Sequence, residues 1–461
     1  MSLHIKFLYE GDKNMKKTNK GRIAAVLAAM VMMTGCGTGN GNGGNAVEIK
    51  PDNNSLVKTS NAEKVNVEYV NRIDETSERS EDKEQAYYSD YKDMDKAALK
   101  IFGQSLTGND DKNVLISPFS INMAMGLVEN GADGNTLSEI EKVIGGGVSV
   151  QDMNRDLRYL SSNMEADQDV NWNVANSIWL NTGNNNTVNL KDSYINSITP
   201  YYDPMVVGLD FNDGAEDKIN SWVNEQTHGM IPTIINETPK GRMALINAVA
   251  FEGEWDRPFS EDDIYEDFNF TNFDGTTSSI TMLSGEGSTY YKFGDGDGFK
   301  VDYKGGQYSF VGILPPEGVE LSDYVNSLIE EDVSLVDCME YGSDQTLFYY
   351  MPEFKTEYSQ EMSDTMKDLG MNDAFSETDA DFSKLNDGNS LYISSIMHKT
   401  YINVNREGTE AAAATEVVMT EGCIMVEDQP SVITLDRPFM YMIVDNTTNM
   451  PIFMGAQNVM Q

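Results

Sequence analysis

Residues 398–415 read HKTYINVNREGTEAAAAT, and the alanines in this stretch raise the first structural question. Four consecutive alanines favour a helix, because alanine has the highest intrinsic helix propensity. The residues around them favour extended structure, since Thr409 and Val417 are β-branched. Gly408, just before them, gives the backbone the freedom that a sharp change of direction needs. From these residues alone, an exposed alanine-rich helix over residues 410–418 and an extended arm of small side chains are both open.

The overall composition predicts a folded and strongly acidic protein. The chain has 461 residues, of which 40% are hydrophobic and 10% aromatic, so a large buried core is possible. Its formal net charge of −41 would repel nucleic acid and anionic lipid head groups and would favour solubility. We therefore expect no nucleic-acid partner, and we expect a monomer.

The sequence carries no positive signal for catalysis or for a cofactor. It has three histidines and three cysteines, and it has no CxxC pair, G-x-S-x-G elbow or P-loop. Histidine supplies most general-base and metal chemistry near neutral pH, so its scarcity argues against an enzyme. The GDGDG run at residues 294–298 lacks the twelfth-position glutamate of a calcium loop and is interpreted as a turn. We expect no enzyme activity, no cofactor and no metal site.

The first 35 residues have the pattern of a leader with a bacterial lipoprotein signal peptide. Four basic residues between positions 16 and 22 precede the apolar run IAAVLAAMVMM, which is too short to span a bilayer. The run ends at TGC, so Cys36 would be the acylated residue and would anchor the chain to a membrane. Residues 36–90 begin with a Gly/Asn-rich tether and are interpreted as a flexible acidic stalk. The alternative is an ordinary signal peptide with an incidental cysteine. We expect an extracytoplasmic protein, either a cell-surface lipoprotein or a secreted one.

The remainder, residues 91–461, predicts one α+β domain. Apolar residues recur at helical spacing over residues 91–106, and Ser117-Pro118 opens a second helix. Further helical patterns lie near residues 135–144, 217–227 and 360–369. Strand-like runs cover residues 170–180, 242–253, 308–315, 346–354 and 437–446. Helices dominate early and strands late, without an internal repeat, which is typical of an α+β domain with an antiparallel sheet.

Several of these segments, taken in order, resemble the serpin family. NVLISPFSINMAMGLVENGADGNT at residues 113–136 is similar to a serpin helix, and LINAVAFEGEWDRPF at residues 245–259 is similar to a strand of the central serpin sheet. The stretch at residues 398–415 resembles the strand and hinge that precede the serpin reactive loop. Four further similar segments lie at residues 219–231, 348–357, 368–385 and 436–455. The resemblance runs from about Tyr91 to Asn458.

This resemblance implies a serpin fold and a suicide-type mechanism of protease inhibition. The fold would have three β-sheets, eight or nine helices and an exposed reactive loop over about residues 408–437. A protease would cleave that loop and form an acyl-enzyme with it. The freed arm would then insert into the central sheet as a new strand and carry the trapped protease with it. Small alanines would pass into the sheet without a steric barrier.

The resemblance also implies positions for the functional residues. Counting fifteen residues from the hinge glycine inclusive puts the cleaved bond between Gly422 and Cys423, with Glu421 as the flanking candidate. The hinge would be formed by Gly408, Thr409, Glu410, Ala411, Ala412, Ala413, Ala414 and Thr415. The polar cluster beneath the place where the strands part, and the aromatic residue where the loop first inserts, would be Ser117, Ser120, Asn247, His398 and Trp255.

One departure from the family and the composition of the loop bear on partners and specificity. Arg406 stands where many serpins carry glutamate, so the family's ion pair there is expected to be absent or reversed. No lysine or arginine occurs between Arg406 and Arg437, which disfavours trypsin-like target proteases. Small residues at the expected bond favour an elastase-like serine protease, whereas Glu421 would suit a glutamate-specific one. A cysteine protease target and a non-inhibitory serpin acting as a binding or chaperone-like module are the alternatives; the small hinge residues argue against the latter.

Overall fold

The computed structural model describes residues 81–167, 169–183, 188, 190–202, 205–212, 214–386, 391–409 and 430–460. The expected leader, most of the expected stalk and residues 410–429 of the expected reactive loop lie outside these ranges. None of the helices within them is long and apolar enough to cross a membrane.

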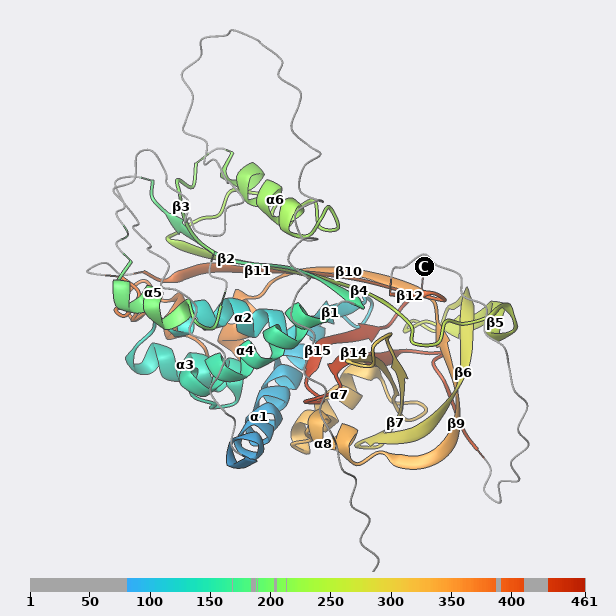
Figure 1. Cartoon of the computed structure of the whole chain (residues 1–461). Coiled ribbons are helices and arrows are strands. Elements are labelled where there is room, and N and C mark those ends of the chain that lie inside the picture. The colour runs from blue at the N-terminus through green and yellow to red at the C-terminus, as the bar shows by residue number, and fades with distance from the viewer. Residues whose placement is uncertain are drawn as a thin grey trace, which may run out of the picture. The chain divides into compact units, whose positions relative to one another are not determined.

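Nine α-helices occur in the described ranges (Figure 1). The first helix starts at Glu81, ahead of the expected boundary at Tyr91. The boundary expected from the sequence lies later because the helical spacing of apolar residues begins only at Tyr91. Tyr91, Met94, Ile101 and Phe102 are all buried on one face, as their spacing predicts. The helices are α1 (Glu81–Leu106), α2 (Pro118–Glu129), α3 (Gly134–Gly145), α4 (Val150–Ala166), α5 (Asp192–Ile198), α6 (Ala215–Gln226), α7 (Leu321–Glu330), α8 (Leu335–Glu340) and α9 (Ser363–Asp368).

The central sheet has six strands in the order β10-β11-β12-β4-β2-β3. Strand β4 is buried along almost its whole length, which explains its nearly continuous apolar sequence. The strands are β2 (Val170–Asn181), β3 (Val206–Leu209), β4 (Met243–Glu254), β10 (Phe354–Glu361), β11 (Ile393–Asn405) and the two-residue β12 (Gly408–Thr409).

The remaining strands form a nine-stranded sheet in the order β1-β15-β14-β8-β7-β6-β9-β13, with β5 paired to β6. Two of the three expected sheets are joined here, because the long strand β6 pairs with β7 near one end and with β5 and β9 along the rest. The strands are β1 (Val114–Ile116), β5 (Ile264–Thr271), β6 (Thr277–Phe293), β7 (Gly296–Asp302), β8 (Tyr308–Leu314), β9 (Ser343–Pro352), β13 (Ser431–Thr434), β14 (Phe439–Asp445) and β15 (Pro451–Gln457).

The central sheet separates two hydrophobic cores, and Figure 1 shows α6 on one side of it and α2 to α4 on the other. The larger core contains the side chains of Leu245, Val249 and Phe251 on β4, together with the helices and the nine-stranded sheet. The smaller core lies under α6, where Trp222 packs on small residues of the sheet such as Ala248. The two faces of β4 therefore alternate between the two cores, as period-two alternation requires.

Candidate functional site

The central sheet has an unfinished position between β4 and β11. These strands pair in parallel from Met243 and Ile393 up to Ala250 and Tyr401. Beyond that pair they diverge, and β12 lies between them, antiparallel to both. The expected hinge thus already occupies the first two places of a strand that would run between β4 and β11.

Gly408 is held where only glycine fits. Its φ angle is +152°, and a Cβ atom on it would lie 2.2 Å from the Gly253 carbonyl oxygen and 2.6 Å from the Glu254 Cα. Both contacts are shorter than any real Cβ contact, and the obstacles are backbone atoms that have no room to move. A side chain at this position would push β12 away from β4.

The turn that leads into β12 is fixed by several hydrogen bonds. The Asn405 Oδ1 atom accepts from the backbone N–H groups of Glu407 (2.9 Å) and Gly408 (3.2 Å). Trp255 lies beside this turn, with its ring stacked on Tyr303 at 4.5 Å and almost completely buried. Its indole N–H donates to the Asn405 carbonyl oxygen at 2.8 Å. The expected aromatic residue is therefore at the end of the sheet where β12 begins.

Arg406 forms an ion pair with Glu353. The basic residue of this pair therefore stands at the position where many serpins carry glutamate, so the pair is reversed rather than absent. The Arg406 Nε and NH2 atoms donate to the two carboxylate oxygens of Glu353 at 2.9 and 2.8 Å. The Arg406 backbone N–H also donates to Glu353, at 2.8 Å. Such a forked pair is stronger and more directional than a single contact. It ties the turn to the residue between β9 and β10.

The expected polar cluster is assembled beneath the place where β4 and β11 are still paired. Asn247 lies directly across the ladder from His398, and the two side chains are hydrogen-bonded. Asn247 Nδ2 also donates to the Ser120 carbonyl and hydroxyl oxygens, each at 2.6 Å. The Ser117 hydroxyl caps α2 by accepting from the Ser120 N–H, and it donates to the Ile452 carbonyl at 2.8 Å. The cluster therefore links α2 to both strands.

Asn176 belongs to the same cluster, although the sequence did not single it out. It lies across the ladder from Asn247 on the neighbouring strand β2, and it accepts a hydrogen bond from the Ser120 hydroxyl at 3.2 Å. Asn176, Asn247 and His398 thus form one row across three strands. The sequence of β2 contains several asparagines, and only the strand register shows which of them joins the row.

His398 is neutral and its tautomer is fixed by its two neighbours. The Ser117 backbone N–H donates to its Nε2 atom at 3.1 Å, so Nε2 is the acceptor and Nδ1 carries the proton that goes to Asn247. The side chain is fully buried, and this burial lowers the pKa of His398 from 6.5 to about 3. Charging it would leave an unpaired cation inside the sheet.

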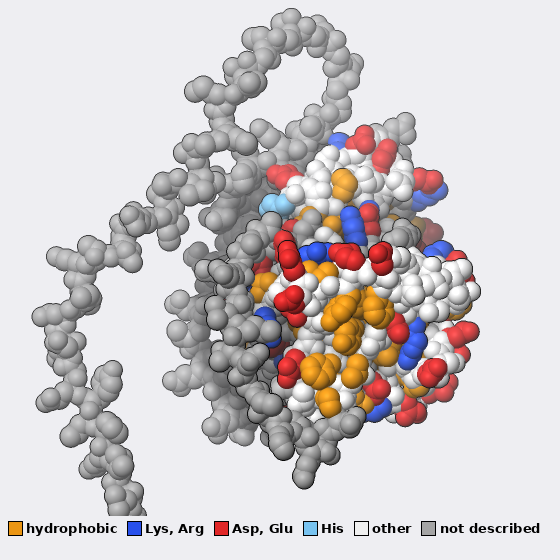
Figure 2. Space-filling view, turned by 90° about the vertical axis from the view of Figure 1, so that its right-hand side faces the viewer, with side chains coloured by type: hydrophobic (Ala, Val, Ile, Leu, Met, Phe, Trp, Pro, Cys, Tyr) orange, Lys and Arg blue, Asp and Glu red, His pale blue; other side chains and the backbone are white. Residues whose placement is uncertain are grey.

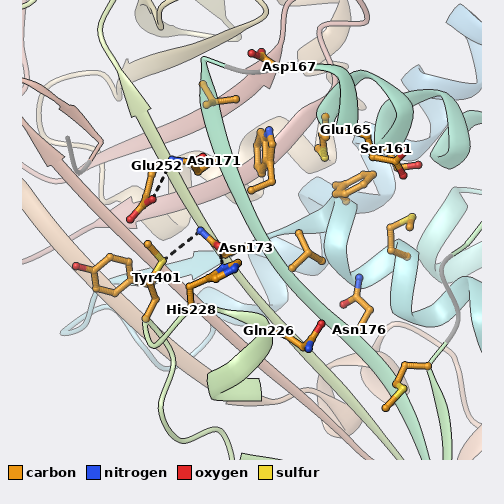
Figure 3. Close-up of a pocket in the computed structure, with 18 of the residues that line it drawn as sticks. Ser161, Glu165, Asp167, Asn171, Asn173, Asn176, Gln226, His228, Glu252 and Tyr401 are labelled. Carbon is orange, nitrogen blue, oxygen red and sulfur yellow. Dashed lines mark hydrogen bonds between the residues drawn. The ribbon is translucent and has the colours of Figure 1, made fainter. Parts of the chain in front are cut away.

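A cavity of about 1170 Å³ lies beside β2 and extends over the outer face of the central sheet (Figure 3). On that face it reaches Glu252 on β4 and Tyr401 on β11, close to the last pair before these strands diverge. The turn after α6 borders it through His228, whose Nδ1 lies 2.6 Å from the Asn173 side-chain oxygen. Space therefore exists above the sheet next to the unfinished position.

The remaining predicted positions lie outside the described residues. They are Cys36, residues 410–415 of the hinge, and Glu421, Gly422 and Cys423 at the expected bond. Of Thr409 only the backbone is described. Within the described part of the chain, no group of three or more histidine, cysteine, aspartate or glutamate side chains is placed to hold a metal ion.

The sequence model of one family, described as serpin (serine protease inhibitor), matches residues 92–460. The chain is a serpin. Leukocyte elastase inhibitor A of Mus musculus is 30% identical to it over 378 residues, covering 78% of this chain and 96% of the inhibitor. Human thyroxine-binding globulin, solved in complex with thyroxine, shares the fold, with a TM-score of 0.70 over 81% of this chain and all of that one, at 23% identity. Serpins are in general inhibitors of proteases rather than enzymes.

The thermophilic serpin tengpin has been solved in two states, and both resemble this serpin. The native state gives a TM-score of 0.75 at 33% identity, covering 85% of this chain and 97% of tengpin. The latent state gives 0.68 at 32% identity, covering 84% and 100%. The described fold is therefore closer to the native tengpin arrangement, which agrees with the direct pairing of β4 and β11.

Proposed function

We propose that this serpin inhibits serine proteases by the suicide route, with elastase-like enzymes as its targets. The proposal rests mainly on the position of β12, which lies between β4 and β11 and pairs with both. A longer strand could extend from β12 between them in the same register with each. Cleavage near Gly422 would free residues 410–422 to continue from Thr409 as a full strand. Serpin loop insertion of this kind is a form of β-strand addition.

The register of β12 fixes where each inserted residue would lie. Thr409 pairs with Val404 on β11 and with Gly253 on β4. Continuing both ladders places Thr415 between His398 and Asn247, which already face each other. Alternation then directs Ala411, Ala413, Thr415 and Val417 toward the main core and directs Glu410 and Glu416 to the opposite face. Over residues 410–419, which would span β4 back to its first residue Met243, no charged residue is directed toward the main core.

The insertion would be favourable because it replaces one ladder by two. The parallel pairing of β4 with β11 would be lost, and antiparallel pairings of the arm with both strands would form; antiparallel pairs are slightly more stable per residue. About ten additional hydrogen bonds at roughly 1 kcal/mol each would give about 10 kcal/mol. That is comparable with the whole stability of a typical domain, about 5–15 kcal/mol. The uncleaved fold would be metastable and kinetically trapped.

Two features described above would hold the uncleaved state. The hydrogen bond between Asn247 and His398 closes the sheet at the centre of the insertion route. The α6 helix shares the smaller core with Ala244, Ile246 and Ala248 of β4, so this core must rearrange when β4 moves. Both barriers are local, so a freed arm that pairs progressively from β12 could overcome them one at a time.

The proposed target class follows from the residues at the expected bond. Gly422 and Cys423 are small, which suits the shallow primary pocket of an elastase-like protease. The similarity to a leukocyte elastase inhibitor supports the same class. A glutamate-specific protease cutting after Glu421 remains the alternative that the same experiment distinguishes.

The test is to mix the protein with pancreatic and neutrophil elastase and to look for a complex that survives boiling in SDS. Mass spectrometry of the released C-terminal fragment then locates the cleaved bond, and we expect a new N-terminus at Cys423. Cleavage without any stable complex would contradict the inhibitory function and favour a non-inhibitory binding role. A new N-terminus at Gly422 would instead identify a cut after Glu421.

We also propose that the protein is tethered outside the cytoplasm by a lipid on Cys36, followed by the acidic stalk. The support is the sequence pattern of residues 16–36. Metabolic labelling with palmitate in a bacterial host should label the full-length protein and leave a Cys36→Ser variant unlabelled. Equal absence of label in both proteins would contradict the tether.

A further inference from the structure

The solvent face of β9, β13 and β5 is apolar where a half-buried sheet is normally polar. On β9, Leu347, Tyr349 and Met351 point into the core, so Phe348 and Tyr350 point outward. Phe348 is 38% exposed, and Val432, opposite it on β13, is 59% exposed. Single exposed apolar residues are ordinary, whereas adjacent ones indicate a contact surface.

These residues form one continuous strip, which we call the apolar row: Val432, Phe348, Tyr350 and Tyr265. The rings of Tyr350 and Tyr265 are in contact, with centroids 6.0 Å apart, and Tyr265 is 44% exposed. Figure 2 looks onto this side of the molecule and shows hydrophobic side chains gathered among acidic and basic ones. The row thus spans the sheet from its edge strand β13 to β5.

Acidic side chains border the apolar row, and one of them is already paired within the chain. Glu286 on β6 is exposed and lies opposite Phe348. The side chain of Glu266, next to Tyr265, is 66% exposed and forms an ion pair with Arg406, with 3.7 Å between its Oε1 atom and the arginine NH2 atom. Strands β5, β9 and β13 contain no lysine or arginine. A partner that fits this surface therefore presents an apolar contact area bordered by basic side chains.

The row lies at the C-terminal end of the segment that contains the expected reactive bond. Val432 is nine positions after Cys423, so the bond lies no more than roughly 30 Å from the row along the chain. A protease domain of about 220 residues has a radius of gyration of about 17 Å and is wide enough to cover that distance. A protease that engages the bond would have its body next to the row.

We propose that the apolar row is a docking surface for the body of the target protease, in addition to the residues around the reactive bond; residues 431–434 at the end of the expected reactive loop form the strand β13 of this surface. The inference rests on the proposed inhibitory function. The partner is a protease that carries an apolar patch with a basic border beside its active-site cleft. The residues around the bond contact only the active-site cleft, so they cannot distinguish proteases that share a primary specificity. The row distinguishes such proteases by contacting their surface outside the cleft.

The experiment measures the second-order rate constant for inhibition of pancreatic and neutrophil elastase by the full chain and by a Phe348→Ser, Val432→Ser double variant. Val319→Ser is the matched control, since Val319 is 41% exposed but lies outside the row. Melting temperatures of the intact variants equal to that of the full chain show that the variants are folded. If the double variant is unstable, the single variant Val432→Ser is measured in its place. We expect a loss of about tenfold in the rate constant for at least one elastase, with the stoichiometry of inhibition and the control unchanged.

The outcomes separate this inference from the proposed function. A stable complex formed at the same rate by the full chain and the double variant with both elastases would overturn the docking surface and leave the inhibitory function standing. No stable complex from the full chain would overturn the inhibitory function and the docking surface together. A full chain that is dimeric by light scattering and becomes monomeric in the double variant would show that the row binds a second copy, which also overturns the proposal.

Discussion

After insertion, the register of β12 would place Thr415 between His398 and Asn247, whose side chains are hydrogen-bonded to each other in the uncleaved protein. Inserting the arm would separate His398 from Asn247, and both are buried polar groups that would need a new partner. A threonine hydroxyl between them can donate to one and accept from the other. We expect Thr415→Val to reduce the rise in melting temperature on loop cleavage, because an unsatisfied buried group costs about 1–3 kcal/mol. Thr415→Ser should keep the full rise; equal rises in both variants would contradict this role.

His398 predicts a specific dependence of stability on pH. Because burial lowers its pKa to about 3, the unfolded chain takes up a proton below pH 6.5 that the folded chain does not. Its contribution to stability is therefore complete above pH 6.5 and falls, by about 1.4 kcal/mol per pH unit, as the pH drops toward 3. Chemical denaturation of the protein and of His398→Asn between pH 7.5 and 5 should show the difference in unfolding free energy shrinking as the pH falls. The difference is the quantity to use, since burial also raises the pKa of other groups such as Asp95. A difference that stays constant with pH would contradict the neutral, buried imidazole.

In the proposed mechanism, insertion starts from the two-residue strand β12. Thr409 pairs with Val404, whose side chain is buried in the main core, and residues paired across a ladder lie on the same face of a sheet. A Thr409→Arg variant would have to bury a charge at the first step, which is costly without a partner. We expect it to be cleaved by elastase without forming an SDS-stable complex, while Thr409→Ser still forms one. A stable complex from Thr409→Arg in normal yield would refute the hinge argument.

After insertion, the opposite face of the arm would carry a charge conflict. Continuing the register of β12 would place Glu410 directly across from Glu252 on β4, and like charges directly opposite destabilise a sheet. We expect Glu252→Gln to raise the melting temperature of the cleaved form, by the equivalent of up to about 1 kcal/mol. Glu254→Gln is the matched control, since Glu254 lies on the same face of the same strand but opposite Gly408. If both variants behave alike, the extrapolated register is wrong.

Strands and helices with a clear apolar period could be predicted from the sequence, and those without one could not. The long strand β6 was missed because Gly285 and Gly287 interrupt its pattern, yet Gly285 is needed there, since the Tyr349 ring occupies the space of its side chain. The cluster residues of α2, β4 and β11 followed from the family resemblance. Asn176 and Glu353 did not, because their partners lie far away in the sequence and only the tertiary register brings them together.

In the proposed mechanism, the central sheet of the whole molecule can accept one more strand. The strands that would flank the added one pair directly along most of their length, and they part only where β12 lies between them. The ion pair of Arg406 with Glu353 and the indole of Trp255 fix the turn from which the arm would pair. Weakening that turn affects the arm's position without touching the reactive bond. We therefore expect Glu353→Gln to increase spontaneous conversion of the intact protein to a non-inhibitory, more heat-stable form, measured as loss of elastase inhibition during incubation at 45 °C, on the order of the mesophilic melting range. No faster loss than in the unmodified protein would contradict that role.

Thermal unfolding of the protein before and after cleavage of its loop tests whether the sheet accepts the arm. A gain of about 10 kcal/mol, at about 2 °C per kcal/mol for a domain of this size, predicts that the cleaved protein melts roughly 20 °C above the intact one. A cleaved protein that melts at the same temperature as the intact one, or below it, would show that no strand has been added.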